Sequence, residues 1–264
     1  MSMHRVIKKT AYATGFGLFC FLVLFLIISP FLPKKQAQVV VVTPEPLAAI
    51  LVENIVAIPH IDQQGPKGKT VDVVARLRNN NARAGIGTYP VTFELRDSGD
   101  AVIQSVTQNE YVLPGGVSYI TALDMQVPPG ATFDHANVVT PKDPQFTIVP
   151  NTAPIPQFSM FPRDRTFVNS GNFVLQQQTG IVTNTSSFDW QVVDVTAVAV
   201  DKDGAIVGVG KTTIGKLLVG EQREFTIQWP RPNSATSQVI AIATTDMFND
   251  SNFVNILGDP NKLR

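Results

Sequence analysis

The sequence is poor in cysteine, histidine and net charge. Its 264 residues include one cysteine, Cys20, and three histidines, His4, His60 and His135. A single cysteine excludes an internal disulfide and a cysteine-based metal site. Three histidines argue against a histidine-based catalytic or zinc centre. The 21 basic residues balance 21 acidic ones, so no broad positive field attracts nucleic acid, and we expect no nucleic-acid partner.

The usual motifs of nucleophilic and nucleotide-binding enzymes are also missing. The chain has no G-x-S-x-G sequence and no phosphate-cradling loop. Residues 201–204 begin like a calcium loop, but the later ligand positions of that loop do not follow, so a hairpin turn is expected there. Residues 79–81, three asparagines, also indicate a turn. We therefore expect no catalytic residue, no cofactor and no metal, and a protein that is not an enzyme.

The chain does contain one long apolar run, from Ala11 to Leu32, without a charged residue. About 20 apolar residues in a helix cross a hydrocarbon core of about 30 Å, so residues 11–32 are expected to form a transmembrane helix in the lipid bilayer. Basic residues at 5, 8 and 9 precede the run, and two lysines at 34 and 35 follow it. This balance favours a cytoplasmic N-terminus, residues 1–10, and an extracytoplasmic remainder.

Three other interpretations of the apolar run fit less well. A cleaved signal peptide has a shorter apolar region and a small-x-small cleavage site, which residues 34–38 do not offer. A lipoprotein needs a small residue before its cysteine, and Phe19 precedes Cys20. A prepilin helix carries a glutamate five residues in, which is missing here. An uncleaved anchor remains the expectation.

Residues 33–46 connect this run to the rest of the chain. They contain a valine run at 39–42 and end in Thr-Pro-Glu-Pro, a composition typical of an extended, semi-stiff stalk. Such a stalk holds a domain away from the lipid headgroups. The alternative is that the valine run is a strand that pairs with a partner chain.

Residues 47–149 are expected to form a first antiparallel sandwich. Apolar side chains alternate with polar ones over 71–78 and again over 89–96, which is typical of half-buried strands. Turn residues follow each of these stretches. Counting every apolar stretch between such turns predicts strands at 47–58, 71–78, 89–96, 102–106, 110–113, 117–125, 132–139 and 146–149.

Residues 150–245 are expected to form a second sandwich, followed by a tail at 246–264 that is either flexible or packed. Strands are predicted at 172–182, 190–200, 206–214, 223–229 and 238–244. The strand at 190–200 changes its apolar phase near Val192 and Val193, which predicts a β-bulge. The strand at 238–244 is almost wholly apolar, which predicts a central position in its sheet. Trp190 and Trp229 are expected in the core.

The two halves share a layout. Residues 180–185 occupy the place of 76–81, residues 201–204 that of 97–100, and residues 218–221 that of 113–116. Each offset is close to 104 or 105 residues, about the length of one domain. Three landmarks at one offset predict a tandem duplication of one domain type.

Residues 93–97, Phe-Glu-Leu-Arg-Asp, resemble the F-x-L-Y-D signature of the FxLYD domain, with Arg96 where tyrosine is usual. The strand and asparagine at 71–79 and the Pro-Gly turn at 113–116 are similar to the elements that flank this signature. The second half keeps the flanking elements without the aromatic signature. The resemblance implies immunoglobulin-like sandwiches on a bacterial envelope protein anchored in the cytoplasmic membrane by one N-terminal helix, and it implies no catalytic residues.

Together these features predict an all-β protein: two tandem immunoglobulin-like antiparallel sandwiches after one N-terminal transmembrane helix. The expected function is a scaffold or protein-interaction module of the cell envelope, in a secretion, pilus or surface-attachment assembly. Its partner would be an envelope protein or another copy of the chain. Arg163, Asp164 and Arg165 are the candidate interaction surface. The alternative is an envelope module that binds glycan or peptide on an exposed patch of Tyr89, Tyr111 or Tyr119.

Overall fold

The computed structural model describes residues 46–60, 69–151, 153, 155–170, 173–229 and 235–254, together with the single residues Phe16 and Leu22. Apart from those two residues and Pro46, the predicted cytoplasmic segment, transmembrane run and stalk lie outside this range, as do residues 255–264 of the predicted tail. None of the helices in the described ranges is long and apolar enough to cross a membrane. Residues 46–264 form one compact unit, separate from residues 1–45.

The first half of this unit consists of two antiparallel sheets. One sheet has the order β1-β2-β5, with bounds Leu51–His60, Thr70–Arg78 and Val117–Gln126. The other has the order β4-β3-β6, with bounds Val102–Val112, Ala84–Arg96 and His135–Val139. A two-residue strand, β7 (Thr147–Ile148), pairs with the start of β3.

The second half repeats this arrangement strand for strand. One sheet has the order β12-β9-β8, with bounds Gln222–Trp229, Phe173–Asn184 and Phe158–Ser170. The other has the order β11-β10-β13, with bounds Ile206–Leu217, Trp190–Val200 and Gln238–Thr244. Strands β8 to β13 therefore pair as β1 to β6 do. The all-β, antiparallel fold predicted from the sequence is confirmed.

The core of the first half comes from the alternation seen in the sequence. Side chains at 71, 73, 75 and 77 of β2, and at 89, 91, 93 and 95 of β3, are each at most 2% exposed. Because successive side chains in a strand point to opposite faces, one face of each strand fills the space between the two sheets. Burial of a large apolar side chain contributes about 1.5–3 kcal/mol, so this alternation is the main source of stability.

The core of the second half is built around Trp190 and Trp229, which are 1% and 4% exposed, as expected. The Trp190 indole N–H donates to Ser186 Oγ at 2.8 Å. Phe253, which follows the short 3₁₀ helix Asp250–Asn252, packs on Trp190 with ring centroids 4.8 Å apart. The beginning of the predicted tail, as far as Val254, is thus part of the packed structure.

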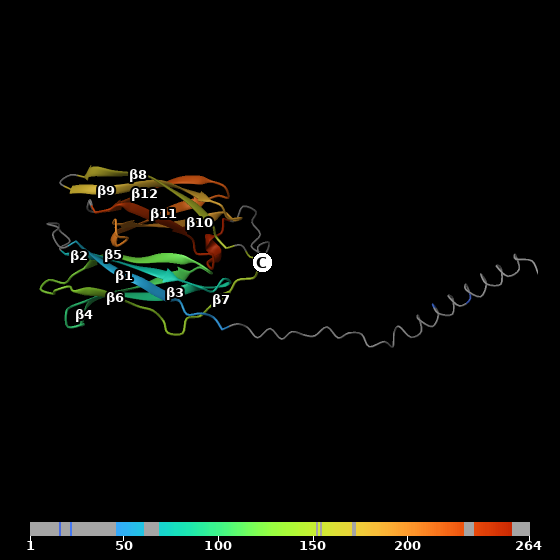
Figure 1. Cartoon of the computed structure of the whole chain (residues 1–264), viewed down its shortest axis with the longest axis horizontal. Coiled ribbons are helices and arrows are strands. Elements are labelled where there is room, and N and C mark those ends of the chain that lie inside the picture. The colour runs from blue at the N-terminus through green and yellow to red at the C-terminus, as the bar shows by residue number, and fades with distance from the viewer. Residues whose placement is uncertain are drawn as a thin grey trace, which may run out of the picture. The chain divides into compact units, whose positions relative to one another are not determined.

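The four sheets form four layers (Figure 1). Sheet β1-β2-β5 faces sheet β11-β10-β13, and a third apolar cluster lies between them. Its buried centre is Val74 of β2, Val198 of β10 and Val209 of β11. We call this contact the inter-sandwich interface; the partly buried residues around it are Val56, Ile58, Tyr119, Ile206 and Ile240.

This interface overturns two details of the sequence prediction. β10 pairs without interruption through Val192 and Val193, and its register shift lies between Ala199 and Val200. The predicted bulge near Val192 was wrong, because Val192 and Val193 lie on opposite faces of a regular strand: Val193 is buried in the second core and Val192 is exposed. β13 is an edge strand, not a central one. It is apolar because one face packs in the second core and Ile240, on the other, meets the first half.

Other differences concern where strands begin and end. The stretches predicted at 102–106 and 110–113 are one strand, β4. The strand predicted at 132–139 begins at His135, and that at 146–149 is reduced to two residues. β8 was not predicted at all, because its Pro162 and charged residues hide the alternation.

Candidate functional site

Two buried asparagines hold equivalent corners of the two halves. Asn79 is 2% exposed, and its Nδ2 donates to the carbonyl of Ala84 at 2.7 Å and to that of Leu113 at 2.9 Å. Asn184 is 0% exposed, and its Nδ2 donates in the same way to Phe188 and Leu217. Each asparagine therefore connects the end of one strand to the beginning of the next strand and to the end of the strand after that: β2 to β3 and β4 in the first half, and β9 to β10 and β11 in the second. These asparagines have a structural role.

The aspartate turns are also equivalent. Asp97 Oδ1 accepts the backbone N–H of Gly99 and of Ala101, each at 2.9 Å. Asp201 Oδ1 accepts the corresponding N–H groups of Asp203 and Ala205, also at 2.9 Å. Because the Asp201 oxygen is occupied by its own turn, the geometry is that of a hairpin turn and not of a calcium loop. In the described part of the chain, no group of three or more His, Cys, Asp or Glu side chains is placed to hold a metal ion.

A small pocket with several polar side chains lies beside the apolar inter-sandwich interface. Tyr111 of β4 reaches across to the second half, where its hydroxyl lies 2.9 Å from Thr244 Oγ1 and donates to Asp194 Oδ2 at 3.5 Å. Asp194 is also 3.5 Å from Lys211 Nζ. The pocket has a volume of about 40 Å³, room for about two or three water molecules, so it is too small for a glycan or a peptide.

The charges around this pocket are affected by burial. Burial raises the pKa of Glu110. The nearby positive charge of Lys211 lowers this pKa in part, and the negative charge of Asp194 raises it further. Burial also raises the pKa of the Tyr111 hydroxyl, and Asp194 adds to this effect. Both groups are therefore biased towards their neutral forms, and Tyr111 acts as a hydrogen-bonding group that joins the halves.

The tyrosines proposed for an exposed patch lie elsewhere. Tyr89 is 2% exposed and belongs to the first core. Tyr111 and Tyr119 line the pocket between the halves. The sequence could not place them there, because nothing in it indicated that the two sandwiches pack face to face.

The predicted interaction surface Arg163–Asp164–Arg165 lies on the edge strand β8, and all three residues are exposed. The register of β8 with β9 shifts between Pro162 and Arg165, so Arg163 and Asp164 form a bulge. Arg163 pairs with Glu224 at 3.0 Å. Arg165 Nη1 donates to the carbonyl of Thr236 at 2.6 Å. The three residues are thus together on the surface, and both arginines already have partners.

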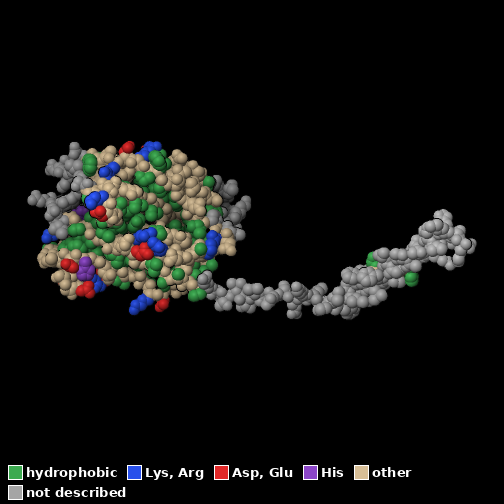
Figure 2. Space-filling view, viewed as in Figure 1, with side chains coloured by type: hydrophobic (Ala, Val, Ile, Leu, Met, Phe, Trp, Pro, Cys, Tyr) green, Lys and Arg blue, Asp and Glu red, His purple; other side chains and the backbone are tan. Residues whose placement is uncertain are grey.

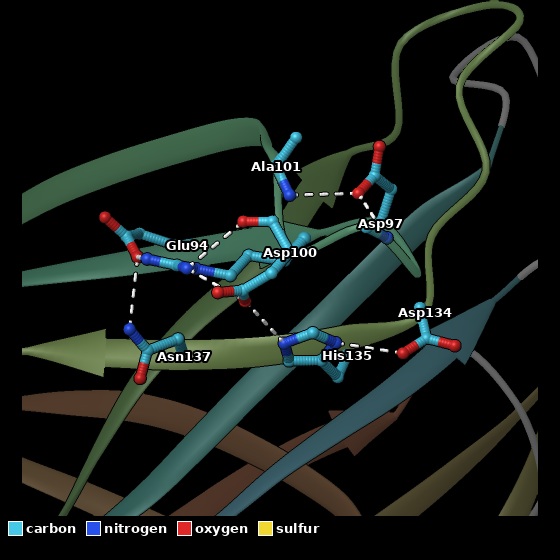
Figure 3. A network of polar contacts seen from close by, with 9 residues as sticks. Glu94, Asp97, Asp100, Ala101, Asp134, His135 and Asn137 are labelled. Atoms are coloured by element: carbon cyan, nitrogen blue, oxygen red, sulfur yellow. Dashed lines mark hydrogen bonds and ion pairs between the residues drawn. The ribbon is translucent and has the colours of Figure 1, made fainter.

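A second surface network, which the sequence did not single out, lies at the β3–β4 turn and β6 (Figure 3). Arg96 contacts Glu94 at 2.6 Å and Asp100 at 2.9 Å, which lowers the pKa of both carboxyls. His135 lies between Asp134, at 2.9 Å, and Asp100, at 3.3 Å. Arg96, the residue that departs from the F-x-L-Y-D pattern, is the centre of this network.

Arg96 and the carboxylates neutralise one another on the surface, and the Tyr111 pocket joins two halves of the molecule. On the face seen in Figure 2, basic and acidic side chains occur in small mixed groups. A surface of this kind does not attract a ligand of one charge over a wide area.

No family model matches the chain, and no curated protein matches it. The resemblance to the FxLYD domain stays a prediction.

Proposed function

We propose that this chain is a non-enzymatic, single-pass protein of a bacterial cytoplasmic membrane that presents two immunoglobulin-like sandwiches outside the cytoplasm. There it serves as a scaffold or protein-interaction module of the cell envelope. The uncharged run at 11–32 and its basic flanks support the anchoring. The strand orders support the immunoglobulin-like assignment, because they match strands A-B-E and C′-C-F of that fold.

The observation that carries the proposal is the inter-sandwich interface. Val74 and Val198 are each 0% exposed although neither belongs to the core of its own half. Burial of these side chains joins the two sandwiches into one body. Domains joined by a flexible linker alone would move independently. A joined pair keeps its outer sheets in a fixed relation, which is what a spacer or scaffold requires.

The proposal is tested on the full-length protein in its own membrane. We expect it to stay in the membrane pellet after alkaline washing, and protease added from outside to remove the sandwiches. A variant that lacks residues 11–32 serves as control and should appear in the soluble fraction. Recovery of the full-length protein in the alkaline supernatant would contradict the anchoring. Full protection from external protease would contradict the location of the sandwiches outside the cytoplasm.

The partner is sought by cross-linking before gentle extraction. Recovery of one specific envelope protein, or of several copies of this chain, supports the scaffold function. Recovery of a lone monomer that retains glycan or peptide would instead favour the ligand-binding alternative, at a surface other than the Tyr111 pocket.

A further inference from the structure

Free sheet edges are the surfaces on which a β protein pairs with another chain, because an edge strand has backbone N–H and C=O groups without partners. Natural proteins protect such edges with charged residues, proline and bulges. The edge strands of the described structure differ in these protections. Most of them carry one or more of these protections.

β8 is protected by Pro162, by its bulge and by two arginines. β1 has a register shift between Glu53 and Val56 and contains Pro59. The remaining protected edges are β5, β11 and β12. β5 has a register shift where it pairs with β2, β11 carries Lys211 and Lys216, and β12 carries Arg223 and Glu224. β13 is half-buried over almost its whole length, and β6 has only five residues.

β4 is the least protected edge, because the two register shifts in its pairing with β3 lie near its ends, between Ile86 and Tyr89 and between Leu95 and Arg96. Residues 104–110, Gln-Ser-Val-Thr-Gln-Asn-Glu, pair with β3 from Leu95 to Tyr89 without a register shift. This stretch contains no proline, lysine or arginine, and its one charged residue, Glu110, lies at its end beside the pocket. Ser105, Thr107 and Asn109 are exposed. The strand lies in an outermost layer of the stack, where no described strand pairs with its free edge (Figure 1).

We propose that the free edge of β4 pairs antiparallel with β4 of a second copy of this chain, about a two-fold axis at Thr107. The two outer sheets then form one continuous sheet with the order β6-β3-β4-β4-β3-β6. The partner's edge offers the same pattern of backbone donors and acceptors, and a two-fold axis makes this pattern self-complementary.

The side chains select a second copy as the occupant. With the axis at Thr107, Val106 lies opposite Gln108, Ser105 opposite Asn109, and Gln104 opposite Glu110, so no like charges face each other. β8 provides the contrast. Its sequence Phe-Pro-Arg-Asp-Arg-Thr-Phe is nearly symmetric about Asp164, so self-pairing there would place Arg163 against Arg165.

A threonine pair adds to the match. Thr92 Oγ1 and Thr107 Oγ1 are 2.8 Å apart across β3 and β4. The two-fold axis brings Thr107 next to its own equivalent, which extends this pair to a row of four hydroxyl groups across the joined sheet. Cross-strand threonine pairs contribute about 0.2–1 kcal/mol each. A contact of this length is weak in dilute solution, and confinement of both copies to one membrane raises their effective concentration.

The proposed β4–β4 pairing rests on the proposed membrane anchoring only for the raised effective concentration. The pairing can therefore fail while the anchoring holds, and the reverse. It is tested by cross-linking full-length protein in its own membrane. In a Cys20→Ser background, Thr107→Cys places the two thiols on adjacent strands, with Cα atoms about 4.5–5.5 Å apart. Thr92→Cys is the matched control, because its two copies are three strand spacings, about 14 Å, apart. With a short thiol cross-linker we expect at least about tenfold more dimer from Thr107→Cys.

A second pair of variants tests the contact without a cross-link. Thr107→Lys places two like charges at the axis and should convert the extracted dimer to monomer without lowering the unfolding temperature. Thr226→Lys, an exposed threonine of β12, should leave the dimer intact. Equal cross-linking of the two cysteine variants, a Thr107→Lys protein that stays dimeric, or cross-linking of Cys-substituted β4 to a different protein would overturn the proposal.

Discussion

At the scale of single residues, the surface network around Arg96 and His135 shows how a departure from a signature is accommodated (Figure 3). Arg96 donates from Nε and Nη2 to Glu94 Oε2 at 3.0 and 2.6 Å, and its Nη1 donates to the Asp100 carbonyl at 3.2 Å. A tyrosine at this position has one hydroxyl and offers no such set of donors. The network closes the β3–β4 turn against β6 through Asn137, which donates to Glu94 at 3.2 Å.

His135 in this network is expected to titrate above its ordinary value. The hydrogen bond that His135 donates to Asp134 raises the pKa of His135 above 6.5, and Asp100 adds to the effect. Because the folded pKa is raised, the stabilisation is fully present below 6.5 and is lost as the pH rises through the folded pKa. An NMR titration of the imidazole ring measures the pKa of His135. Asp134→Asn should lower the pKa towards 6.5, whereas Asp143→Asn, at an exposed site, should not. A pKa at or below 6.5 in the unmodified protein would contradict this.

At the scale of strands, the buried asparagines are the joints between elements. Asn79 directly follows β2, and its amide reaches the carbonyl of Ala84, the first residue of β3, and that of Leu113, which follows β4. The sequence predicted a turn and a duplication here, but its alignment of residues 180–185 with 76–81 places Asn184 over Asn80. Three consecutive asparagines look alike in the sequence, and only the hydrogen bonds show that Asn79 is the equivalent residue.

Replacement of Asn79 tests this joint. Asn79→Asp keeps the size of the side chain and removes the two N–H donors, which leaves two carbonyl groups without their partner. A buried polar group left without its partner costs about 1–3 kcal/mol, so we expect the free energy of unfolding to fall by about 2–4 kcal/mol. Asn80→Asp, at the exposed neighbouring position, should change it by less than about 0.5 kcal/mol. Denaturant unfolding measures both. Equal effects would show that the turn as a whole, and not the Asn79 amide, matters.

The strands that the sequence predicted best are those with one buried face. Alternation located the buried residues of β3, such as Tyr89 and Phe93, without tertiary information. The strands predicted worst are those that do not have one buried and one exposed face. β10 and β13 contact both the second core and the first half, and β8 is exposed from Phe161 to Val168. For these strands, burial depends on what packs against them, which local sequence does not encode.

At the scale of the whole molecule, the inter-sandwich interface was the feature that sequence could not anticipate. Val74 and Asp72 are on the face of β2 that a lone sandwich exposes to solvent, yet they are 0% and 4% exposed. Asp72 accepts a hydrogen bond from the backbone N–H of Asp124 at 2.7 Å and lies 2.8 Å from His60. When both faces of a strand are buried, a buried aspartate such as Asp72 has the sequence pattern of a solvent-facing residue, and only its hydrogen-bond partners show the difference.

The pocket beside this interface gives the molecule an unusual dependence on pH. Burial raises the pKa of Glu110 above the ordinary value of 4.5, so the folded state binds this proton more tightly than the unfolded chain does. The contribution of Glu110 to stability therefore falls as the pH rises from 4.5 through its folded pKa, and it stays unfavourable at neutral pH. This is opposite to the acid destabilisation caused by a carboxylate whose pKa is lowered.

Replacement of Glu110 with glutamine isolates this effect. Glu110→Gln stays neutral at every pH, so the variant should be more stable than the unmodified protein at pH 7 to 8. The difference should shrink below about pH 4, where Glu110 is protonated in both states. Glu224→Gln, at a side chain that is 78% exposed, should show no such convergence. Thermal unfolding across this pH range measures the difference. A Glu110→Gln protein that is less stable at neutral pH would show that attraction to Lys211 outweighs burial, and that the two sandwiches are held together by an ion pair as well as by the Val74–Val198 contact.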